Sequence, residues 1–251
     1  MAAVSGKVER LRDGNWASIE VGERLQLRDS IRALPRSKAD LDLGPEARLT
    51  LAEDSELKLA ELSGTVHRVR LERGRVTAAY APQGERVLRI EDRSGQAVAE
   101  ARAARFSAMA TAGAFVVATE TGKVNLSSGS DSVEIAPGEQ SIAKPGATPS
   151  AARPIPVSLL LKVAAASRPS GPCRTIEGSA SPGSEVFVEE TRVAVGPDGR
   201  FSYEVEDPGR RQFRVVTRDA TGRSTEETVR CRAPPPAPKE KIDAVEIRWH
   251  E

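Results

Sequence analysis

The sequence predicts an all-β protein in which a first domain of β-solenoid or sandwich type is followed by a second β-sandwich and a short C-terminal strand. Two observations predict this fold class. Apolar residues alternate with polar ones over short segments, and clusters of Gly, Pro, Asp and Ser separate these segments. A chain of 251 residues has the length of two ordinary domains. Aromatic residues are only 4% of the chain, so we expect cores of Val, Leu, Ile and Ala.

The first domain opens with a strand and continues with a ladder of leucine pairs. Val4–Leu11 has the pattern of a strand interrupted by Gly6, and Asp13-Gly14 is typical of a turn. Leucine pairs then recur every eight residues, each on one face of a short strand: Leu41 with Leu43, Leu49 with Leu51, and Leu57 with Leu59. So short a repeat predicts a meander or a squat β-solenoid in which successive strands stack their leucines.

The segment Val66–Tyr80 carries a change of phase. Val69 and Leu71 alternate with arginines, and the apolar alternation resumes at Val76 on the opposite parity. Gly74 supplies the backbone freedom that such a break requires, so we expect a corner there, where short strands give way to longer ones. We interpret His67 and the neighbouring arginines as a solvated strand face.

Further strands are predicted at Arg86–Glu91, Lys123–Leu126 and Val133–Ile135. The alanine-rich run 97–112 has a composition that permits a helix, but Val and Phe residues around it favour strands flanking a bend. These segments place the first domain at residues 1–146. A segment rich in Pro, Ala and Ser forms a linker at 147–154.

The second domain, residues 155–233, has seven short strands separated by regular turn signals, which is typical of a β-sandwich. The predicted strands are Val157–Val163, Cys173–Glu177, Glu185–Glu189, Arg192–Val195, Arg200–Val205, Arg211–Arg218 and Ser224–Cys231. Phe201, Tyr203, Val205, Phe213 and Val215 are the expected inward positions.

Cys173 and Cys231 are the only two cysteines, and they lie in the first and last strands that follow the opening strand of the second domain. We expect them to form a disulfide, which a loop of this length would make worth about 4 kcal/mol in the chain-entropy model. The alternative is two unrelated free thiols. A disulfide favours an oxidising compartment.

Residues 234–251 combine a Pro-rich spacer with a tail in which Val245, Ile247 and Trp249 alternate with charged residues. The tail is too short to fold alone. We expect it to pair with an exposed strand edge, and we take these three side chains as candidate contacts with a partner.

Charge and hydropathy exclude several functions. The chain has 37 Lys and Arg against 36 Asp and Glu, a net charge of +1, which gives no global field to attract nucleic acid. No apolar stretch approaches the roughly 20 residues of a membrane-spanning helix, and no signal peptide is visible. Either the protein is cytoplasmic, or a signal or lipid anchor belongs before Met1. The cysteines favour the second alternative, and with it the periplasm or an outer-membrane association.

No catalytic or cofactor-binding motif is present, and we expect no enzyme activity, cofactor or metal. Two weaker hypotheses concern acidic clusters. Glu53, Asp54 and Glu56 could form an acid/base or a calcium cluster, although a charged turn explains them better. Asp198, Asp207 and Asp219 all lie in turns and could line one end of the sandwich and bind calcium weakly.

The first 146 residues share a spread pattern with one known family: Gly6-x-Val8, Trp16, Gly22, Leu27–Arg32, Ser37-x-Ala39-x-Leu41-x-Leu43, Leu71-x-x-Gly74-x-Val76, Thr121–Val124 and Pro137–Gln140. This part resembles the FecR domain, which implies an extracytoplasmic β domain. The second part resembles a bacterial immunoglobulin-like domain, through Gly178-x-Ala180-x-Pro182-Gly183, Asp198-Gly199-x-Phe201 and Asp219-x-x-Gly222. That resemblance implies a fold rather than an activity.

Three functions follow as hypotheses. The first is a non-enzymatic binding or scaffolding module of the bacterial envelope that engages a protein or a cell-wall polymer. The second is the periplasmic sensor part of a FecR-type transmembrane signalling regulator. The third is a carbohydrate-binding accessory protein.

Overall fold

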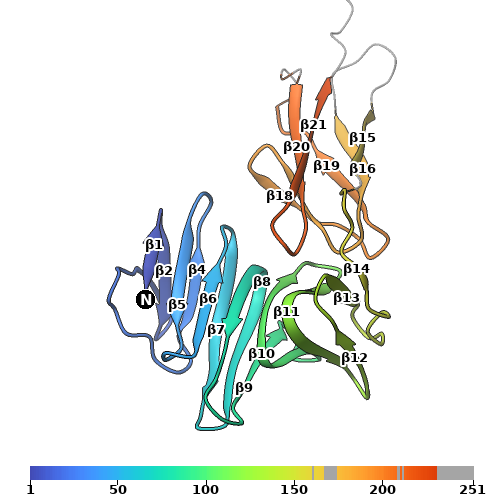
Figure 1. Cartoon of the computed structure of the whole chain (residues 1–251). Helices are drawn as coiled ribbons and strands as arrows, with labels where there is room; N and C mark the ends of the chain where they lie inside the picture. The colour runs from blue at the N-terminus through green and yellow to red at the C-terminus, as the bar shows by residue number, and fades with distance from the viewer. Residues whose placement is uncertain (160, 167–173, 208–209, 211, 231–251) are drawn as a thin grey trace, which may run out of the picture.

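The computed structural model describes residues 1–159, 161–166, 174–207, 210 and 212–230, and every regular element within these ranges is a β-strand. Figure 1 shows a broad first part with a second, smaller part above one end of it. The strands of the first part are β1 Ala3–Ser5, β2 Val8–Arg12, β3 Asn15–Ser18, β4 Ser30–Ala33, β5 Lys38–Asp42, β6 Ala47–Leu51, β7 Ser55–Leu62, β8 Val66–Tyr80, β9 Val87–Asp92, β10 Ala97–Ala110, β11 Phe115–Ser128, β12 Asp131–Ile135, β13 Glu139–Ala143 and β14 Arg153–Pro154.

The first part is a sandwich of two layers whose strands are hydrogen-bonded into one continuous sheet. One layer contains β3, β2, β4, β7, the first half of β8, β9, the first half of β10, the second half of β11 and β12. The other contains β1, β5, β6, the second halves of β8 and β10, the first half of β11, β13 and β14. Long strands that bend from one layer into the other therefore join the two layers.

The predicted corner at Gly74 is present. Strand β8 pairs with β7 and β9 before this residue, and with β6 and β10 after it. The rings of His67 and Tyr80 lie 6.4 Å apart, whereas thirteen residues of straight strand would separate them by about 43 Å. The strand thus folds back on itself, and its buried positions change parity at Gly74.

Glycine is required at the corners for two reasons. Gly74 has a φ of +81°, and a Cβ there would lie 2.2 Å from the Ser55 hydroxyl oxygen. Gly122, at the bend of β11, has a φ of +75°, and its Cβ would lie 2.2 Å from the carbonyl oxygen of Ala103. Both positions combine a left-handed backbone with a close approach of another strand, and only glycine tolerates both.

The leucine ladder forms the core, but not by stacking in one column. All six leucines of the three pairs are buried. Strands β5 and β6 form a hairpin in one layer, whereas β7 pairs with β4 and β8 in the other. The third pair therefore faces the first two across the core, within a single hydrophobic cluster. Among the described strands, only the parallel return from β8 to β9 resembles a solenoid turn.

The alanine-rich run is a strand, β10, as the flanking residues favoured. The predicted linker is hydrogen-bonded to the first sheet. Ser150 donates its backbone N–H to the carbonyl of Ile142, β14 pairs with β13, and Ile155 donates to Gly138. Residues 147–154 therefore lie against the first sheet, and the chain leaves this sheet only after Ile155.

The second part is a sandwich of a three-stranded and a four-stranded sheet, in the orders β15-β16-β19 and β18-β17-β20-β21. Its strands are β15 Leu161–Ala166, β16 Thr175–Ala180, β17 Glu185–Val188, β18 Thr191–Val193, β19 Arg200–Glu204, β20 Gln212–Arg218 and β21 Ser224–Arg230. Phe201, Phe213 and Val215 are buried in its core, with Tyr203 and Val205 packed against them. The immunoglobulin-like assignment stays a prediction.

The opening strand of the sandwich starts later than predicted, at Leu161. Val157, the predicted first residue, is 95% exposed, because it belongs to the connection between the two parts.

Candidate functional site

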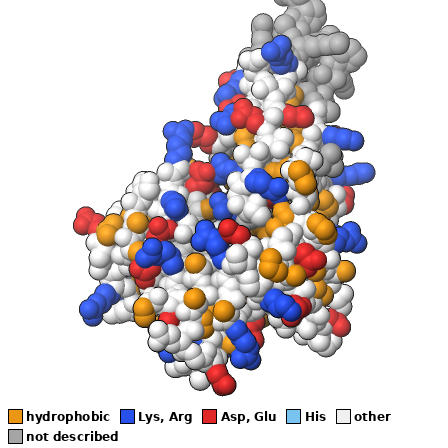
Figure 2. All heavy atoms as spheres, in the orientation of Figure 1, with side chains coloured by type: hydrophobic (Ala, Val, Ile, Leu, Met, Phe, Trp, Pro, Cys, Tyr) orange, Lys and Arg blue, Asp and Glu red, His pale blue; other side chains and the backbone are white. Residues whose placement is uncertain are grey.

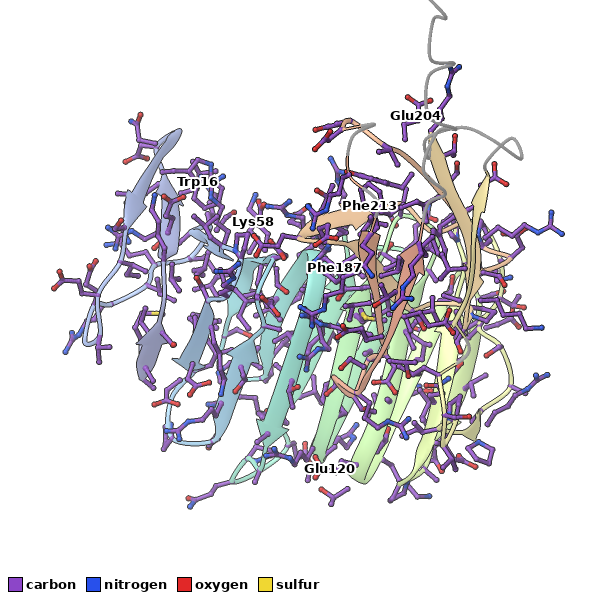
Figure 3. The ribbon with its side chains drawn as sticks, turned by 90° about the horizontal axis from the view of Figure 1, so that it is seen from above. Trp16, Lys58, Glu120, Phe187, Glu204 and Phe213 are labelled. Carbon is purple, nitrogen blue, oxygen red and sulfur yellow. The ribbon has the colours of Figure 1, made fainter. Side chains whose placement is uncertain are left out.

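The candidate site lies where the second sandwich covers one edge of the first. At this edge, here called the corner edge, several connections of the first sandwich converge: Ala52–Asp54, Glu72–Arg75, Asp92–Gln96, Ala110–Ala114 and Ala143–Pro145. Figures 1 and 3 show the second sandwich over the β8–β13 end of this edge, with the β1–β4 end uncovered. The corners of the first part thus serve as a platform for the second.

Two arginines of the sandwich contact neighbouring residues of the β6–β7 turn. Arg218 forms an ion pair of 2.6 Å with Glu53. Arg192 donates a hydrogen bond of 2.8 Å from Nη2 to the backbone carbonyl of Asp54. An exposed ion pair between Arg36 and Glu190 joins the two parts nearby. These contacts join residues that lie more than a hundred positions apart in the sequence.

Glu185 of β17 is the most deeply buried carboxylate at this interface. Its side chain is 5% exposed, and Oε1 lies 3.0 Å from Nη2 of Arg192. That oxygen accepts no hydrogen bond of good geometry within the described residues. Burial raises the pKa of Glu185, and the positive charges of Arg192, Arg75 and Arg218 offset this effect only in part.

Arg75 faces the sandwich from the corner itself. Burial lowers its pKa, although Glu185 attracts the charged guanidinium. An arginine remains protonated at neutral pH despite such a shift. The guanidinium lies close to Gly222, where even a Cβ would be 3.0 Å from the Arg75 Cζ atom. The Gly222 turn of the sandwich therefore fits directly over this side chain.

Apolar contacts complete the interface. Ala220 of the sandwich packs with Met109, Val116 and Ala118 in a small hydrophobic cluster, to which Ala114, Ile142 and Ile155 also belong. A Cβ on Gly183 would lie 2.5 Å from a methyl group of Val116. The second part thus packs on the outer face of the first as well as on its edge.

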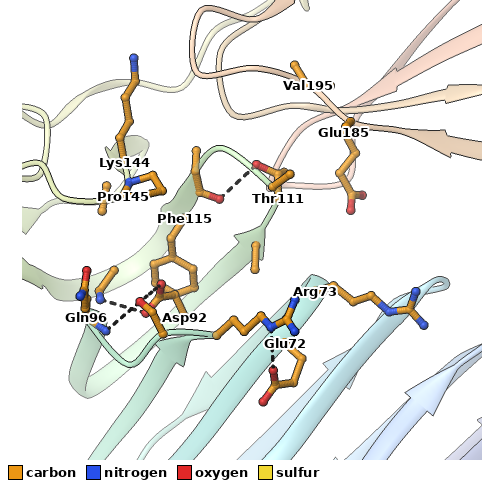
Figure 4. A pocket seen from close by; sticks show the side chains of 18 of the residues that line it. Glu72, Arg73, Asp92, Gln96, Thr111, Phe115, Lys144, Pro145, Glu185 and Val195 are labelled. Atoms are coloured by element: carbon orange, nitrogen blue, oxygen red, sulfur yellow. Dashed lines mark hydrogen bonds and ion pairs between the residues drawn. The ribbon is translucent and has the colours of Figure 1, made fainter. Parts of the chain in front are cut away.

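A cavity of about 840 Å³ remains between the two parts. Figure 4 shows Phe115 and Thr111 on the sheet side, with Glu185 directed into the cavity from the sandwich. Its lining residues include Ala110, Ala114, Phe115, Val193 and Val195 among the apolar ones, and Glu72, Arg73, Asp92, Arg93, Lys144, Glu185 and Arg192 among the charged ones. Cavities of this size at domain interfaces are common ligand sites in proteins.

Five of the site residues predicted from the sequence cannot be placed relative to this interface. Cys173, Cys231, Val245, Ile247 and Trp249 lie outside the described residues. The expected disulfide and tail pairing therefore stay predictions.

The calcium hypotheses gain no support in the described part of the chain, where no group of three or more acidic, His or Cys side chains could hold a metal ion. Asp219 instead accepts hydrogen bonds from Thr221 and Arg223, and the Asp198 carboxylate pairs with Arg200. Glu53 and Glu56 pair with different arginines.

The prediction of a solvated face around His67 was wrong for the histidine. His67 is only 7% exposed, because the fold-back of β8 places it beside Tyr80 at the edge opposite the corner edge. Burial lowers its pKa. The neighbouring Arg68 and Arg70 do face outward, paired with Glu61 and Glu91. Figure 2 shows charges of both signs interspersed over the visible face.

Sequence reasoning considered Glu53 and Asp54 only as a cluster in a charged turn and missed Glu185, Arg192 and Arg218, although one signal pointed to the strand that carries Glu185. Val186, Phe187 and Val188 are consecutive apolar residues, and a strand that is apolar on both faces is covered on both faces. All four residues of β17 are buried. Arg192 and Arg218 lie over the ring of Phe187, at 5.4 Å and 4.8 Å from its centroid. Figure 3 shows Phe187 above the long strands.

Fold and site together define an all-β protein of two parts, in which the second sandwich packs on the corner edge of the first. Residues 29–125 of the chain match the FecR protein family, which confirms the resemblance of the first part. This match covers strands β4 to β10 and most of β11.

Two solved structures are similar to the chain, both described as a "putative anti-sigma factor" from Parabacteroides distasonis ATCC 8503. Each has a TM-score of 0.44, with 16% and 17% sequence identity, and each covers 50% of this chain. The chain spans 59% of the length of these structures. No curated protein is significantly similar to it. In the described part of the chain, no helix is long and apolar enough to cross a membrane.

Proposed function

We propose that this chain is the extracytoplasmic sensor part of a FecR-type transmembrane signalling regulator, with no enzymatic activity. The FecR family match at residues 29–125 is the observation that carries this proposal. The match includes the bent strands β8 and β10, which connect the two layers and present the corner edge. The part of the chain that matches the family is thus also the part on which the second sandwich rests.

The geometry supports a sensor that works through contact between its two parts. The connection between them is short, and its Pro156 carbonyl accepts a hydrogen bond of 2.5 Å from Arg223. The interface is partly apolar, partly ionic, and encloses a cavity. A partner or solute that alters this contact would change the surface that the first part presents.

The test is a transcriptional one in the source bacterium. Deleting the gene should change a defined set of transcripts and abolish their response to an envelope signal, and the intact gene should restore both. A gene lacking the codons for residues 29–125 should fail to restore the response while its product is still detected in the envelope fraction. An unchanged transcriptome in the deletion strain would contradict the proposal.

The second candidate is a binding or scaffolding module of the envelope that engages a protein or a cell-wall polymer. The observation that favours it is the second sandwich, whose outer strands β18 and β21 each have one unpaired edge within the described sheet. Strand edges of this kind accept an added strand from a partner. Co-sedimentation of the purified chain with cell-wall sacculi, together with an unchanged transcriptome, would favour this function over the first.

A further inference from the structure

We propose that protonation of Glu185 and Asp54 controls how tightly the second sandwich docks on the corner edge, with acid favouring the docked arrangement. The inference concerns only the two parts of this chain, so it holds or fails independently of the regulator function. It rests on an uneven distribution of charges at the interface, in which two carboxylates share one arginine.

Glu185 is the first of these carboxylates. It projects from β17 into the cavity (Figure 4) and is 5% exposed, so it has little access to water. Its ion pair with Arg192 is 3.0 Å long but lacks hydrogen-bonding geometry at Oε1. A buried carboxylate with so few donors is held at a substantial free-energy penalty in its charged form.

Asp54 is the second, on the opposite side of the interface. It lies in the β6–β7 turn with a φ of +53°, and Arg192 binds its backbone carbonyl rather than its carboxylate. Within the described residues, the Asp54 carboxylate accepts no hydrogen bond and forms no ion pair. Arg192 therefore lies between two carboxylates and neutralises neither one fully.

Most of the other charged groups that face these two carboxylates are already engaged in ion pairs. Glu185 is faced by Arg192, Arg218 and Arg75, and also by Asp54. Asp54 is faced by Arg192, Arg73 and Arg218, and also by its neighbour Glu53. Arg218 pairs with Glu53 at 2.6 Å and Arg73 with Glu56 at 3.6 Å, which leaves Arg75 as a nearby cation without an ion pair among the described residues.

The direction of the effect follows from burial. Burial is the main cause that raises the pKa of both carboxylates in the docked arrangement, and undocking returns them to water. The docked arrangement therefore binds protons more tightly. Its destabilisation by these groups is full above the raised pKa values and disappears as the pH falls towards their ordinary values of 4.5 and 3.8.

The experiment is hydrogen exchange on the full chain between pH 5 and pH 8, corrected for the intrinsic exchange rate. Amides of residues 111–118 and 191–196, which line the interface from both sides, should be several-fold more protected at pH 5 than at pH 8, because each carboxylate pKa that docking raises makes the docking equilibrium more favourable in acid. Small-angle scattering should show a larger radius of gyration at pH 8.

Two variants separate this proposal from a general pH effect. Glu185→Gln and Asp54→Asn mimic the protonated groups, so each should reduce the pH dependence of interface protection. Asn tolerates the left-handed backbone at position 54, so this second variant remains informative if Gln at 185 does not fold. Glu177→Gln, on an exposed position of β16 in the same sandwich, should leave the pH dependence intact. Protection that does not vary with pH, or an equal effect of Glu177→Gln, would overturn the proposal.

Discussion

Gly74 shows how one residue determines the course of the chain. Its left-handed backbone and its contact with Ser55 allow β8 to bend from one layer into the other. Any side chain at this position would combine backbone strain with a clash against the backbone of β7. The alternation of Val69, Leu71 and Val76 indicated the bend because the buried parity changes across it.

We therefore predict that Gly74→Ala destabilises the protein by about 3 kcal/mol or more. Gly129→Ala is the matched control, because Gly129 also has a positive φ, +64°, but its Cβ would point into open space. It should destabilise by only about 1–2 kcal/mol. Chemical denaturation of both variants measures the difference. Equal losses would show that sterics at the corner are unimportant.

The ion pair of Asp29 with Arg12 should make the stability of the first part sensitive to acid. Burial alone would raise its pKa, but Arg12 forms a bidentate pair with it, at 2.9 Å and 2.5 Å, and the backbone N–H of Gln26 donates to it. The net effect lowers the pKa below the ordinary value of 3.8. Its stabilisation is therefore present above pH 3.8 and is lost as the pH falls through the lowered value.

Asp29→Asn should accordingly lower the free energy of unfolding by about 2 kcal/mol at pH 7, the typical contribution of hydrogen bonds to a charged group. The difference from the unmodified protein should shrink as the pH is lowered from 4 to 2. Asp13→Asn, in an exposed turn with no Asp–Arg pair of this kind, should change stability by less than about 0.5 kcal/mol. A pH-independent loss in Asp29→Asn would mean that the ion pair is not its cause.

At the scale of elements, the strand β17 has different roles on its two faces. Val186 and Val188 fill the core of the second sandwich, while Glu185 and Phe187 face the interface region. Phe187 supports the guanidinium groups of Arg192 and Arg218 and so positions the cations that contact the β6–β7 turn. The strand thereby connects the sandwich core to the corner edge.

Arg192→Ala should loosen the interface more than any other single arginine removal, because it leaves Glu185 without an ion pair and removes the hydrogen bond to Asp54. Removing one partner of a buried pair typically costs about 3–5 kcal/mol, and neutralisation of Glu185 would reduce this value. We expect faster hydrogen exchange at residues 111–118. Arg200→Ala removes an arginine whose side chain is 84% exposed, and should leave the exchange unchanged. Similar exchange in both variants would contradict the assigned role.

At the scale of the whole molecule, the prediction of an oxidising compartment depends on the two cysteines. Cys173 and Cys231 precede and follow most of the second sandwich in sequence, and we predict that they form a disulfide. A thiol assay on denatured, unreduced protein should detect no free thiol, and reduction should lower the stability of the second part by about 4 kcal/mol or less. Two free thiols would remove the main argument from the sequence for an extracytoplasmic location.

Much of the fold could be predicted because strands and turns are local. The alternation of apolar and polar residues identified β9, β12 and the strands of the second sandwich. Gly74 identified the corner in β8. Pairing partners could not be predicted in this way. The leucines at 49 and 57 have the same pattern, yet they lie in opposite layers, because alternation defines which face is buried but not which strand lies alongside.

The sequence by itself determined the all-β class, the division into two parts, the FecR resemblance and the corner at Gly74. The strands and the corner depend on backbone preferences and on residue patterns within about fifteen positions, and the resemblance depends on short motifs spread over the first 146 residues. Only the tertiary structure decided the candidate site. Arg192 and Asp54 are 138 residues apart, and their contact arises from the docking of one completed sandwich on another. The raised pKa of Glu185 was likewise decided by the tertiary structure. It follows from burial between the two parts of the chain, which no local sequence pattern specifies.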